Sequence, residues 1–199
     1  CVFLITDTLV MDTILEKVKL FAEEAHGAQQ RKFSGEPYIR HLIRVAEICA
    51  EYTDDTVILS AALLHDVLED TDVTESNMTA FLRSVLNEED TIRTIRLVVE
   101  LTDVYIKKNF PQLNRKTRKN METIRLAVVS QDAQTIKYAD IIDNAIDIAS
   151  HDTDFSKVYL KEAMMLLERM GNGHPALRER AGHVVKDCLL RIRSGLSHR

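Results

Sequence analysis

The sequence predicts an all-α protein, and three observations support this fold class. Of the 199 residues, 45% are hydrophobic, yet only six are Gly and three are Pro, so few residues interrupt a regular backbone. Aromatic residues make up only 6%, and β-branched residues rarely alternate with polar ones as they do in strands. Apolar residues recur instead at helical spacing, as in Ile14, Val18, Phe21, Ala22 and Ala25. A chain of this length can bury a substantial core as a single domain.

Charge and cysteine usage exclude several classes of protein. The net charge of −5 argues against a protein that holds duplex nucleic acid on a large basic surface. The three cysteines are an odd number at unrelated spacings, so no disulfide framework is indicated and a reducing, cytoplasmic location is expected. No apolar run reaches transmembrane length, so we expect no membrane partner. No feature of the sequence indicates an oligomeric state.

The first ten residues differ from the rest of the chain. They begin with an apolar run, Cys1–Ile5, but lack the basic leader of a signal peptide. Met11 resembles a natural start. We therefore interpret residues 1–10 as an N-terminal extension and residues 11–199 as the functional domain.

Capping residues and helical periodicity predict the order of the helices. The first is expected to start at the capping box Thr13-x-x-Glu16 and to end near His26. The others are expected near residues 38–52, 57–70, 77–86, 88–101, 115–129, 134–150, 155–170 and 175–193. Ser-Gly and Glu-Pro signals predict a basic loop over 29–38, and Pro111 indicates a long loop or lid over 102–114. A turn and cap are expected at 152–154.

The most unusual chemistry lies in His65-Asp66-Val67-Leu68-Glu69-Asp70, which follows the apolar run 57–64. Residues four apart share a helix face, so His65 is expected near Glu69 and Asp66 near Asp70. Burying an imidazole and three carboxylates without compensation is costly, and a bound cation is the usual compensation. The alternative is a helix end that carries solvated acids.

A second polar face is expected on the helix near 134–150. Asp140, Asn144 and Asp147 have the spacing i, i+4, i+7 and therefore line one side of that helix. On a peripheral helix they would form only an exposed acidic stripe.

His41, on the helix near 38–52, is by itself more simply a histidine at the edge of the core. A basic cluster is either a solvated helix face or a contact for an anionic substrate; it consists of Arg115, Lys116, Arg118 and Lys119.

Four segments, read together, resemble one known family. They are Arg-Lys-Phe-Ser-Gly-Glu-Pro-Tyr-Ile-Arg-His at 31–41, Ala-Leu-Leu-His-Asp-Val-Leu-Glu-Asp-Thr-Asp at 62–72, Leu-Thr-Asp at 101–103, and Lys-Tyr-Ala-Asp through Asn at 137–144. In this order they closely resemble the hydrolase domain of RelA/SpoT-type enzymes, which are HD-superfamily proteins that remove the 3′-pyrophosphate from ppGpp and pppGpp. The resemblance covers about residues 21–148. It implies an HD-domain helical bundle and a stand-alone small alarmone hydrolase, similar to the metazoan SpoT homologues.

The resemblance also implies roles for individual residues. One divalent cation would be bound by His41, His65, Asp66 and Asp140, a set of two nitrogen and two oxygen ligands that suits Mn²⁺, with Zn²⁺, Fe²⁺ and Co²⁺ as chemical alternatives. Glu69 and Asp70 match the catalytic acidic pair that positions and deprotonates water. The positions that match substrate-binding residues are Arg31, Lys32, Ser34, Asn144 and Asp147, the last of which replaces a smaller polar residue.

The implied function is metal-dependent hydrolysis of a small-molecule nucleotide, a (p)ppGpp-type alarmone, to GDP or GTP and pyrophosphate. This chain departs from the family at Phe33, which is inserted between Lys32 and Ser34. It departs again where Asp143 and Ile146 replace residues that are often His or Tyr and Arg or Lys. Because a basic residue is missing beside the nucleotide, the alternative function is that of an HD-superfamily nucleotidase or phosphatase with another nucleotide, for example NADPH.

Overall fold

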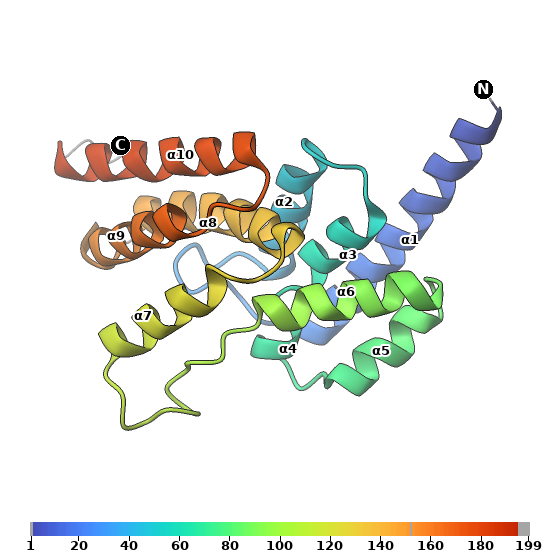
Figure 1. Cartoon of the computed structure of the whole chain (residues 1–199), viewed down its shortest axis with the longest axis horizontal. Helices are drawn as coiled ribbons and strands as arrows, with labels where there is room; N and C mark the ends of the chain where they lie inside the picture. Colours follow the sequence, from blue (N-terminus) through green and yellow to red (C-terminus); the bar gives the residue numbers. More distant parts are fainter. Residues whose placement is uncertain (1, 152, 195–199) are drawn as a thin grey trace. The chain divides into compact units, whose positions relative to one another are not determined.

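The computed structural model describes residues 2–151 and 153–194. These residues form α-helices joined by turns and loops, with one isolated antiparallel bridge between Gln30 and Pro37 and no strand (Figure 1). The all-α prediction is therefore confirmed. The described residues fall into two compact units. Unit 1 comprises the residues up to Gln30 together with Glu36–Thr102, and unit 2 comprises Arg31–Gly35 together with the residues from Asp103 onward.

Unit 1 is built around one buried helix. Its helices are α1 (Val2–His26), α2 (Ile39–Ala50), α3 (Thr56–Leu64), α4 (Val67–Asp70), α5 (Glu75–Arg83) and α6 (Glu88–Leu101). Every residue of α3 from Val57 to Leu64 is buried, as expected for a helix that is apolar on all sides. It packs against α1, α2 and α6 (Figure 1). The end of α3 therefore has a fixed position in the core of unit 1.

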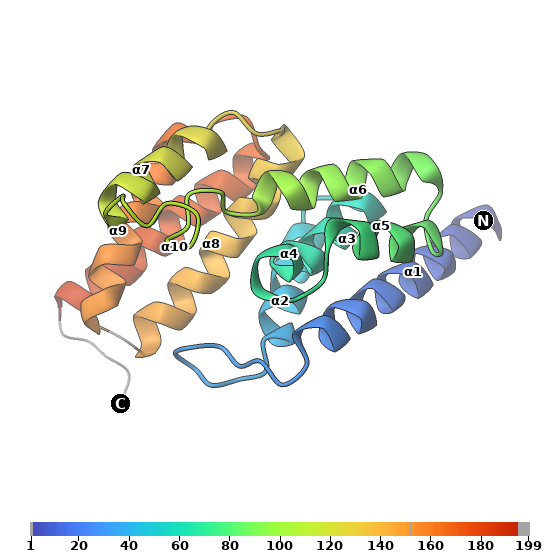
Figure 2. The same ribbon diagram turned by 90° about the horizontal axis from the view of Figure 1, so that it is seen from below.

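Unit 2 is built around α8. Its helices are α7 (Arg115–Leu126), α8 (Gln131–His151), α9 (Thr153–Arg169) and α10 (Pro175–Arg193). Helix α8 packs against α9 and α10 (Figure 2). The turn between α9 and α10 closes tightly on α8, where the Tyr138 hydroxyl donates to the Met170 carbonyl at 2.7 Å. A Cβ on Gly173 would lie 2.4 Å from the Tyr138 ring, so this turn requires glycine.

Several predicted helix starts are confirmed, whereas α1, α5, α8 and α9 begin at least two residues earlier than predicted, α8 at Gln131 and α9 at Thr153. Helix α7 begins after Asn114, whose side chain accepts from the Thr117 amide at 2.9 Å. The predicted start at Thr13 is wrong because α1 begins at Val2; residues 2–12 contain no Gly or Pro to end the helix. Helix α5 begins at Glu75, since Thr74 and Asn77 form a capping box and Asn77 is the third helical residue. The interpretation of residues 1–10 as an extension stays a prediction.

The continuous helix predicted over 57–70 is also wrong. The Asp55 carboxylate caps α3 by accepting from the Val57 amide at 2.8 Å, but α3 ends at Leu64 and α4 begins only at Val67. His65 and Asp66 form the turn between them. Of the turn expected at 152–154, residue 152 lies outside the described residues, and α9 already includes Thr153.

The connection that precedes α7 is irregular, as predicted, and is attached to α7. The buried carboxylate of Glu122 accepts from the amides of Val104 and Tyr105 at 3.1 and 2.9 Å. Lys119 pairs with Asp103 at 3.0 Å. These contacts hold the beginning of the 103–114 segment on α7.

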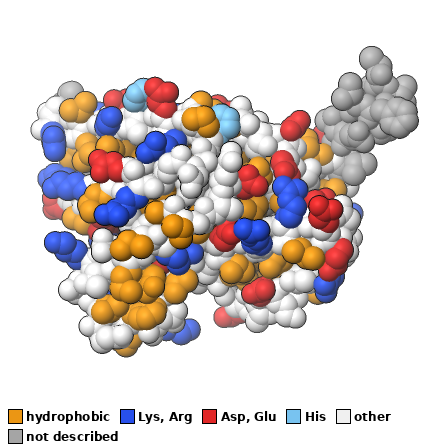
Figure 3. Space-filling model, viewed as in Figure 1, with side chains coloured by type: hydrophobic (Ala, Val, Ile, Leu, Met, Phe, Trp, Pro, Cys, Tyr) orange, Lys and Arg blue, Asp and Glu red, His pale blue; other side chains and the backbone are white. Residues whose placement is uncertain are grey.

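Charged side chains of both signs share the surface. Figure 3 shows acidic and basic side chains interspersed on one face of the molecule. In the basic cluster, Arg115 pairs with Glu162 and Arg118 donates to the Leu113 carbonyl. These contacts favour a structural, solvated role for the cluster. Among the described helices, none combines the length and apolarity needed to cross a membrane.

Candidate metal centre

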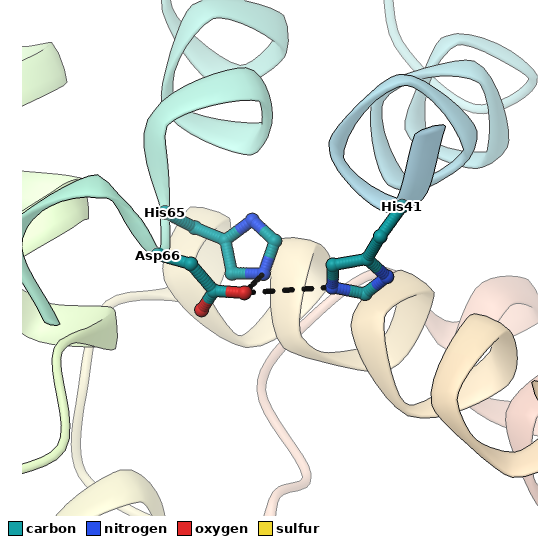
Figure 4. A group of neighbouring side chains, drawn as sticks. All are labelled: His41, His65 and Asp66. Carbon is teal, nitrogen blue, oxygen red and sulfur yellow. Dashed lines mark ion pairs between the residues drawn. The ribbon is translucent and has the colours of Figure 1, made fainter. Parts of the chain in front are cut away.

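Three side chains of unit 1 converge on one point. Oδ2 of Asp66 lies 3.2 Å from Nε2 of His65 and 3.5 Å from Nε2 of His41 (Figure 4). One potential ligand atom from each residue lies within 4.8 Å of the other two. His41 comes from α2, and His65 and Asp66 come from the turn after α3.

The end of α3 explains how two consecutive residues face the same point. In a continuous helix, successive side chains diverge by about 100° around the axis. Here α3 stops at Leu64, and Asp66 adopts φ −99° and ψ −7° before α4 begins. The turn therefore directs both side chains toward His41. Both imidazoles are buried, with exposures of 0% for His41 and 2% for His65.

The protonation of His65 is defined by its backbone contact. Its Nδ1 lies 2.8 Å from the carbonyl oxygen of Ala62. A carbonyl can only accept a hydrogen bond, so Nδ1 carries the proton. Nε2 is then the nitrogen that can offer a lone pair to a cation, an arrangement common among histidines that bind metals.

The electrostatics of the cluster also favour a cation. Burial alone would raise the pKa of Asp66, but the adjoining imidazoles, first that of His65 and then that of His41, hold it well below its ordinary value. The carboxylate is therefore ionised between two imidazole nitrogens. Donor atoms about 2.1 Å from one metal lie up to about 4.2 Å apart, so a small contraction would suit a divalent ion. His41, His65 and Asp66 could thus hold such an ion.

The two predicted catalytic acids lie on the short helix α4, and both are exposed. Partial burial and then the charge of Asp66 raise the pKa of Asp70, while polar contacts with Tyr38 and Gln29 partly oppose the rise. Asp70 therefore interacts with Asp66, as their spacing predicted. Glu69 lies one residue before Asp70 and is likewise exposed.

Asp140, the fourth predicted ligand, lies on α8 in unit 2. The residue is only 4% exposed. Oδ1 accepts from the Asn144 amide, and Oδ2 lies 2.8 Å from the Lys137 ammonium group. The interpretation of this helix face as an exposed acidic stripe is therefore wrong, whereas the place of Asp140 in the ligand set stays a prediction.

Arg31 is enclosed by the same face of α8. Its guanidinium donates to Asn144 Oδ1 at 2.7 Å and to Asp147 Oδ2 at 3.1 Å. A third carboxylate, that of Asp143, lies 4.0 Å away. The Arg31 residue is only 8% exposed. Its positive charge is therefore compensated inside unit 2, and the predicted common face of Asn144 and Asp147 is confirmed.

The next residues of the loop differ from Arg31. Phe33 stacks on Phe155 of α9, with ring centres 5.6 Å apart. Lys32 is exposed, and its ammonium group lies over both rings, 5.2 and 5.8 Å from their centres. Ser34 Oγ is buried and has no hydrogen-bond partner among the described residues.

Two tyrosines near these clusters received no role from the sequence. Tyr38 donates to Asp66 Oδ2 at 2.7 Å, and burial followed by the charges of Asp66 and Asp70 raises its pKa. Its position three residues before His41 was the available signal. Burial and then the charge of Asp140 likewise raise the pKa of Tyr159 on α9. No local pattern distinguished Tyr159 from a core residue.

Comparison with known proteins places these features in a family. The sequence profile of the HD domain matches residues 20–172. The human guanosine-3′,5′-bis(diphosphate) 3′-pyrophosphohydrolase MESH1 is 36% identical over 131 residues, which cover 64% of this chain and 65% of MESH1. The bifunctional (p)ppGpp synthase/hydrolase SpoT of Escherichia coli K12 is 33% identical over 166 residues, or 80% of this chain and 22% of SpoT.

A solved structure agrees with these matches. It is described as a metazoan ortholog of SpoT that hydrolyzes ppGpp and plays a role in starvation responses. It superposes with a TM-score of 0.72 at 25% identity, covering 87% of this chain and 94% of that one. The chain spans about a fifth of the length of the first curated relatives it matches, from Mycoplasma pneumoniae (21%) and Mycoplasma genitalium (19%).

Proposed function

Because this chain belongs to the HD-domain family, we propose that it hydrolyses the 3′-pyrophosphate of a (p)ppGpp-type alarmone, releasing pyrophosphate and leaving GDP or GTP. The observation that carries this proposal is the convergence of His41, His65 and Asp66, within the same chain segment as the acidic residue Asp70. Relatives that match most of the HD region are named for this reaction.

The proposed cofactor is one divalent cation, with Mn²⁺ as the preferred ion. His41, His65, Asp66 and Asp140 would bind it through two nitrogen and two oxygen atoms, a donor set that also admits Zn²⁺, Fe²⁺ or Co²⁺. Such a cation, when bound, lowers the pKa of water and neutralises charge on phosphoryl oxygens.

Glu69 and Asp70 are the proposed general base and water-positioning residues. Both are exposed on α4, so water can reach them. The raised pKa of Asp70 makes its carboxylate a stronger base than an ordinary aspartate, which suits the removal of a proton from the attacking water. General-base catalysis of this kind contributes about 10²–10⁴-fold to rate.

The proposed nucleotide contacts fall into two groups. Lys32 is exposed and has no ion pair among the described residues, so its charge is available to a phosphate. Ser34 offers a buried hydroxyl whose hydrogen-bonding capacity is unused in the described part of the chain. Arg31 donates to both Asn144 and Asp147, so these three residues would act mainly by fixing the 31–35 loop on α8.

The test is product analysis with a panel of nucleotides and Mn²⁺. The panel contains ppGpp, pppGpp, the adenosine counterpart of ppGpp and NADPH, and chromatography separates the products. We expect pyrophosphate and GDP from ppGpp, and no turnover by Asp66→Ala. If the wild type releases no pyrophosphate from any 3′-pyrophosphorylated nucleotide, the proposal is wrong.

One observation favours a second candidate, a nucleotidase or phosphatase of the same superfamily. The positive charge of Arg31 is balanced by Asp147 and Asp143, and Ile146 stands where the family often has a basic residue. The site therefore offers less positive charge to a polyanionic substrate. Release of orthophosphate from NADPH, without release of pyrophosphate from ppGpp, would indicate this function.

A further inference from the structure

Tyr38 contacts the oxygen on which the candidate metal centre converges. Its hydroxyl donates to Asp66 Oδ2 at 2.7 Å. The same oxygen lies 3.2 Å from His65 Nε2 and 3.5 Å from His41 Nε2. The other carboxylate oxygen takes no part in these three contacts. The phenol therefore acts on the atom of Asp66 that faces both imidazoles.

The ring of Tyr38 is itself held in place from two sides. One face stacks on the imidazole of His26, with ring centres 4.6 Å apart and planes 13° apart. Its edge meets His41 with ring centres 5.7 Å apart and planes 77° apart. The Tyr38 amide also donates to the Gln29 carbonyl at 2.9 Å. The hydroxyl is thus at the end of a ring with little freedom to move.

The end of α1 supplies the residues that support this ring. His26 is the last residue of α1 and is buried. Its Nδ1 lies 2.8 Å from the side-chain oxygen of Gln29. The amide nitrogen of the same Gln29 side chain reaches Asp70 Oδ2 at 3.5 Å. His26, Gln29 and Tyr38 therefore form one layer of side chains beneath both Asp66 and Asp70.

Asp66 needs such support because of where it lies. It occupies the two-residue turn between α3 and α4, a helix of only four residues. A carboxylate in a turn can rotate, and each rotation moves Oδ2 away from the imidazoles. A hydrogen bond from a fixed phenol selects one orientation and still leaves Oδ2 a lone pair for a cation.

We infer that Tyr38, held by its stack on His26, is a positioning residue that orients Asp66 Oδ2 for metal binding. The inference rests on the metal site of the proposed function. Partners of this kind, which orient metal ligands without touching the metal, typically contribute about 10–100-fold to metal affinity. Because the Tyr38 hydroxyl contacts Oδ2, the proposed ligand atom, we expect its loss to lower the metal affinity within that range.

The test compares the Mn²⁺ affinities of purified variants, measured by competition with a chelating dye. Tyr38→Phe removes the hydroxyl and keeps the ring. We expect it to bind Mn²⁺ about tenfold more weakly and to regain turnover when Mn²⁺ is raised to saturation. His26→Ala removes the stack and should weaken Mn²⁺ binding in the same direction, whereas His26→Phe keeps the stack and should bind nearly as the wild type does.

The matched control is Tyr138→Phe. It also deletes a buried hydroxyl, which donates to the Met170 carbonyl in unit 2. We expect this variant to lose stability without losing Mn²⁺ affinity. If Tyr38→Phe binds Mn²⁺ within twofold of the wild type while Asp66→Ala does not bind it, the positioning role is refuted and the proposed metal site stands. If Asp66→Ala binds Mn²⁺ as the wild type does, the metal site and the inference both fail.

Discussion

Arg31 and Lys32 are neighbours in the sequence, yet the structure predicts opposite consequences of replacing them. The Arg31 guanidinium is buried and bonded to Asn144 and Asp147, with Asp143 nearby. Replacing it with Met removes the guanidinium from two buried carboxylates, Asp147 and Asp143. Removal of one partner from a buried ion pair costs about 3–5 kcal/mol. We therefore expect Arg31→Met to be strongly destabilised.

Urea unfolding measures this loss. With a slope of about 2 kcal/mol per molar urea, the midpoint of Arg31→Met should fall by about 2 M. The double variant Arg31→Met/Asp147→Leu also removes the carboxylate that pairs with Arg31 at 3.1 Å. It should be more stable than the sum of the single changes predicts, by about 0.5–3 kcal/mol. That coupling would identify the Arg31–Asp147 pair, and not the Arg31 side chain alone, as the stabilising element.

Lys32→Met is the matched control. Its ammonium group is exposed, so the free energy of unfolding should change by no more than about 0.5 kcal/mol. If Lys32 contacts a phosphate, loss of one charge-assisted contact worth about 1.5–3 kcal/mol lowers kcat/KM by roughly ten- to a hundredfold. The reasoning is refuted if Arg31→Met keeps the wild-type unfolding curve and loses only kcat/KM, because Arg31 would then act on the substrate directly.

Three further predictions concern other parts of the chain. Glu69→Gln should keep Mn²⁺ bound but lower kcat by about 10²–10⁴-fold, because it removes a proposed general base. Loss of the ion in this variant would make Glu69 a metal ligand instead. Glu122→Ala removes the carboxylate that accepts from two backbone amides of the 103–114 segment. Those amides should then exchange hydrogen faster by an order of magnitude or more. Unchanged exchange would mean that other contacts hold the segment. Gly173→Ala should cost about 1–3 kcal/mol of stability through overpacking. Gly171→Ala is the control, because no atom lies within 4 Å of the added Cβ, and it should leave the unfolding midpoint unchanged. Equal midpoints for the two variants would contradict the close fit at Gly173.

The sequence predicted helix starts correctly where the signal, such as a capping side chain, acts only on residues close to it in the chain. Asn114 caps α7 because its own side chain reaches an amide three residues later. Pro175 begins α10, as predicted, because its ring suits the first turn of a helix. Thr13 had the pattern of a cap, but residues 2–12 also favour a helix, and α1 runs through it. A capping motif therefore predicts a start only where the preceding residues leave the helix.

The sequence alone, through its residue types and its resemblance to a family, determined which side chains are candidates for a functional site. The family match of residues 20–172 supports the HD-domain assignment that the motifs predicted. Helical spacing predicted that Asn144 and Asp147 share a face, and their common contact with Arg31 confirms it. Spacing works there because α8 is continuous from Gln131 to His151. Within one unbroken helix, sequence separation alone defines direction.

Only the tertiary structure decided how the candidate centre is assembled. The sequence predicted one helix over 57–70, in which His65 and Asp66 would diverge. In the structure α3 ends at Leu64, and the turn that follows brings both side chains to His41. The structure likewise placed Arg31 beside the carboxylates of Asp143 and Asp147, which are more than 110 positions away in the sequence. Contacts between distant segments depend on burial and charge compensation in three dimensions, which no local pattern contains.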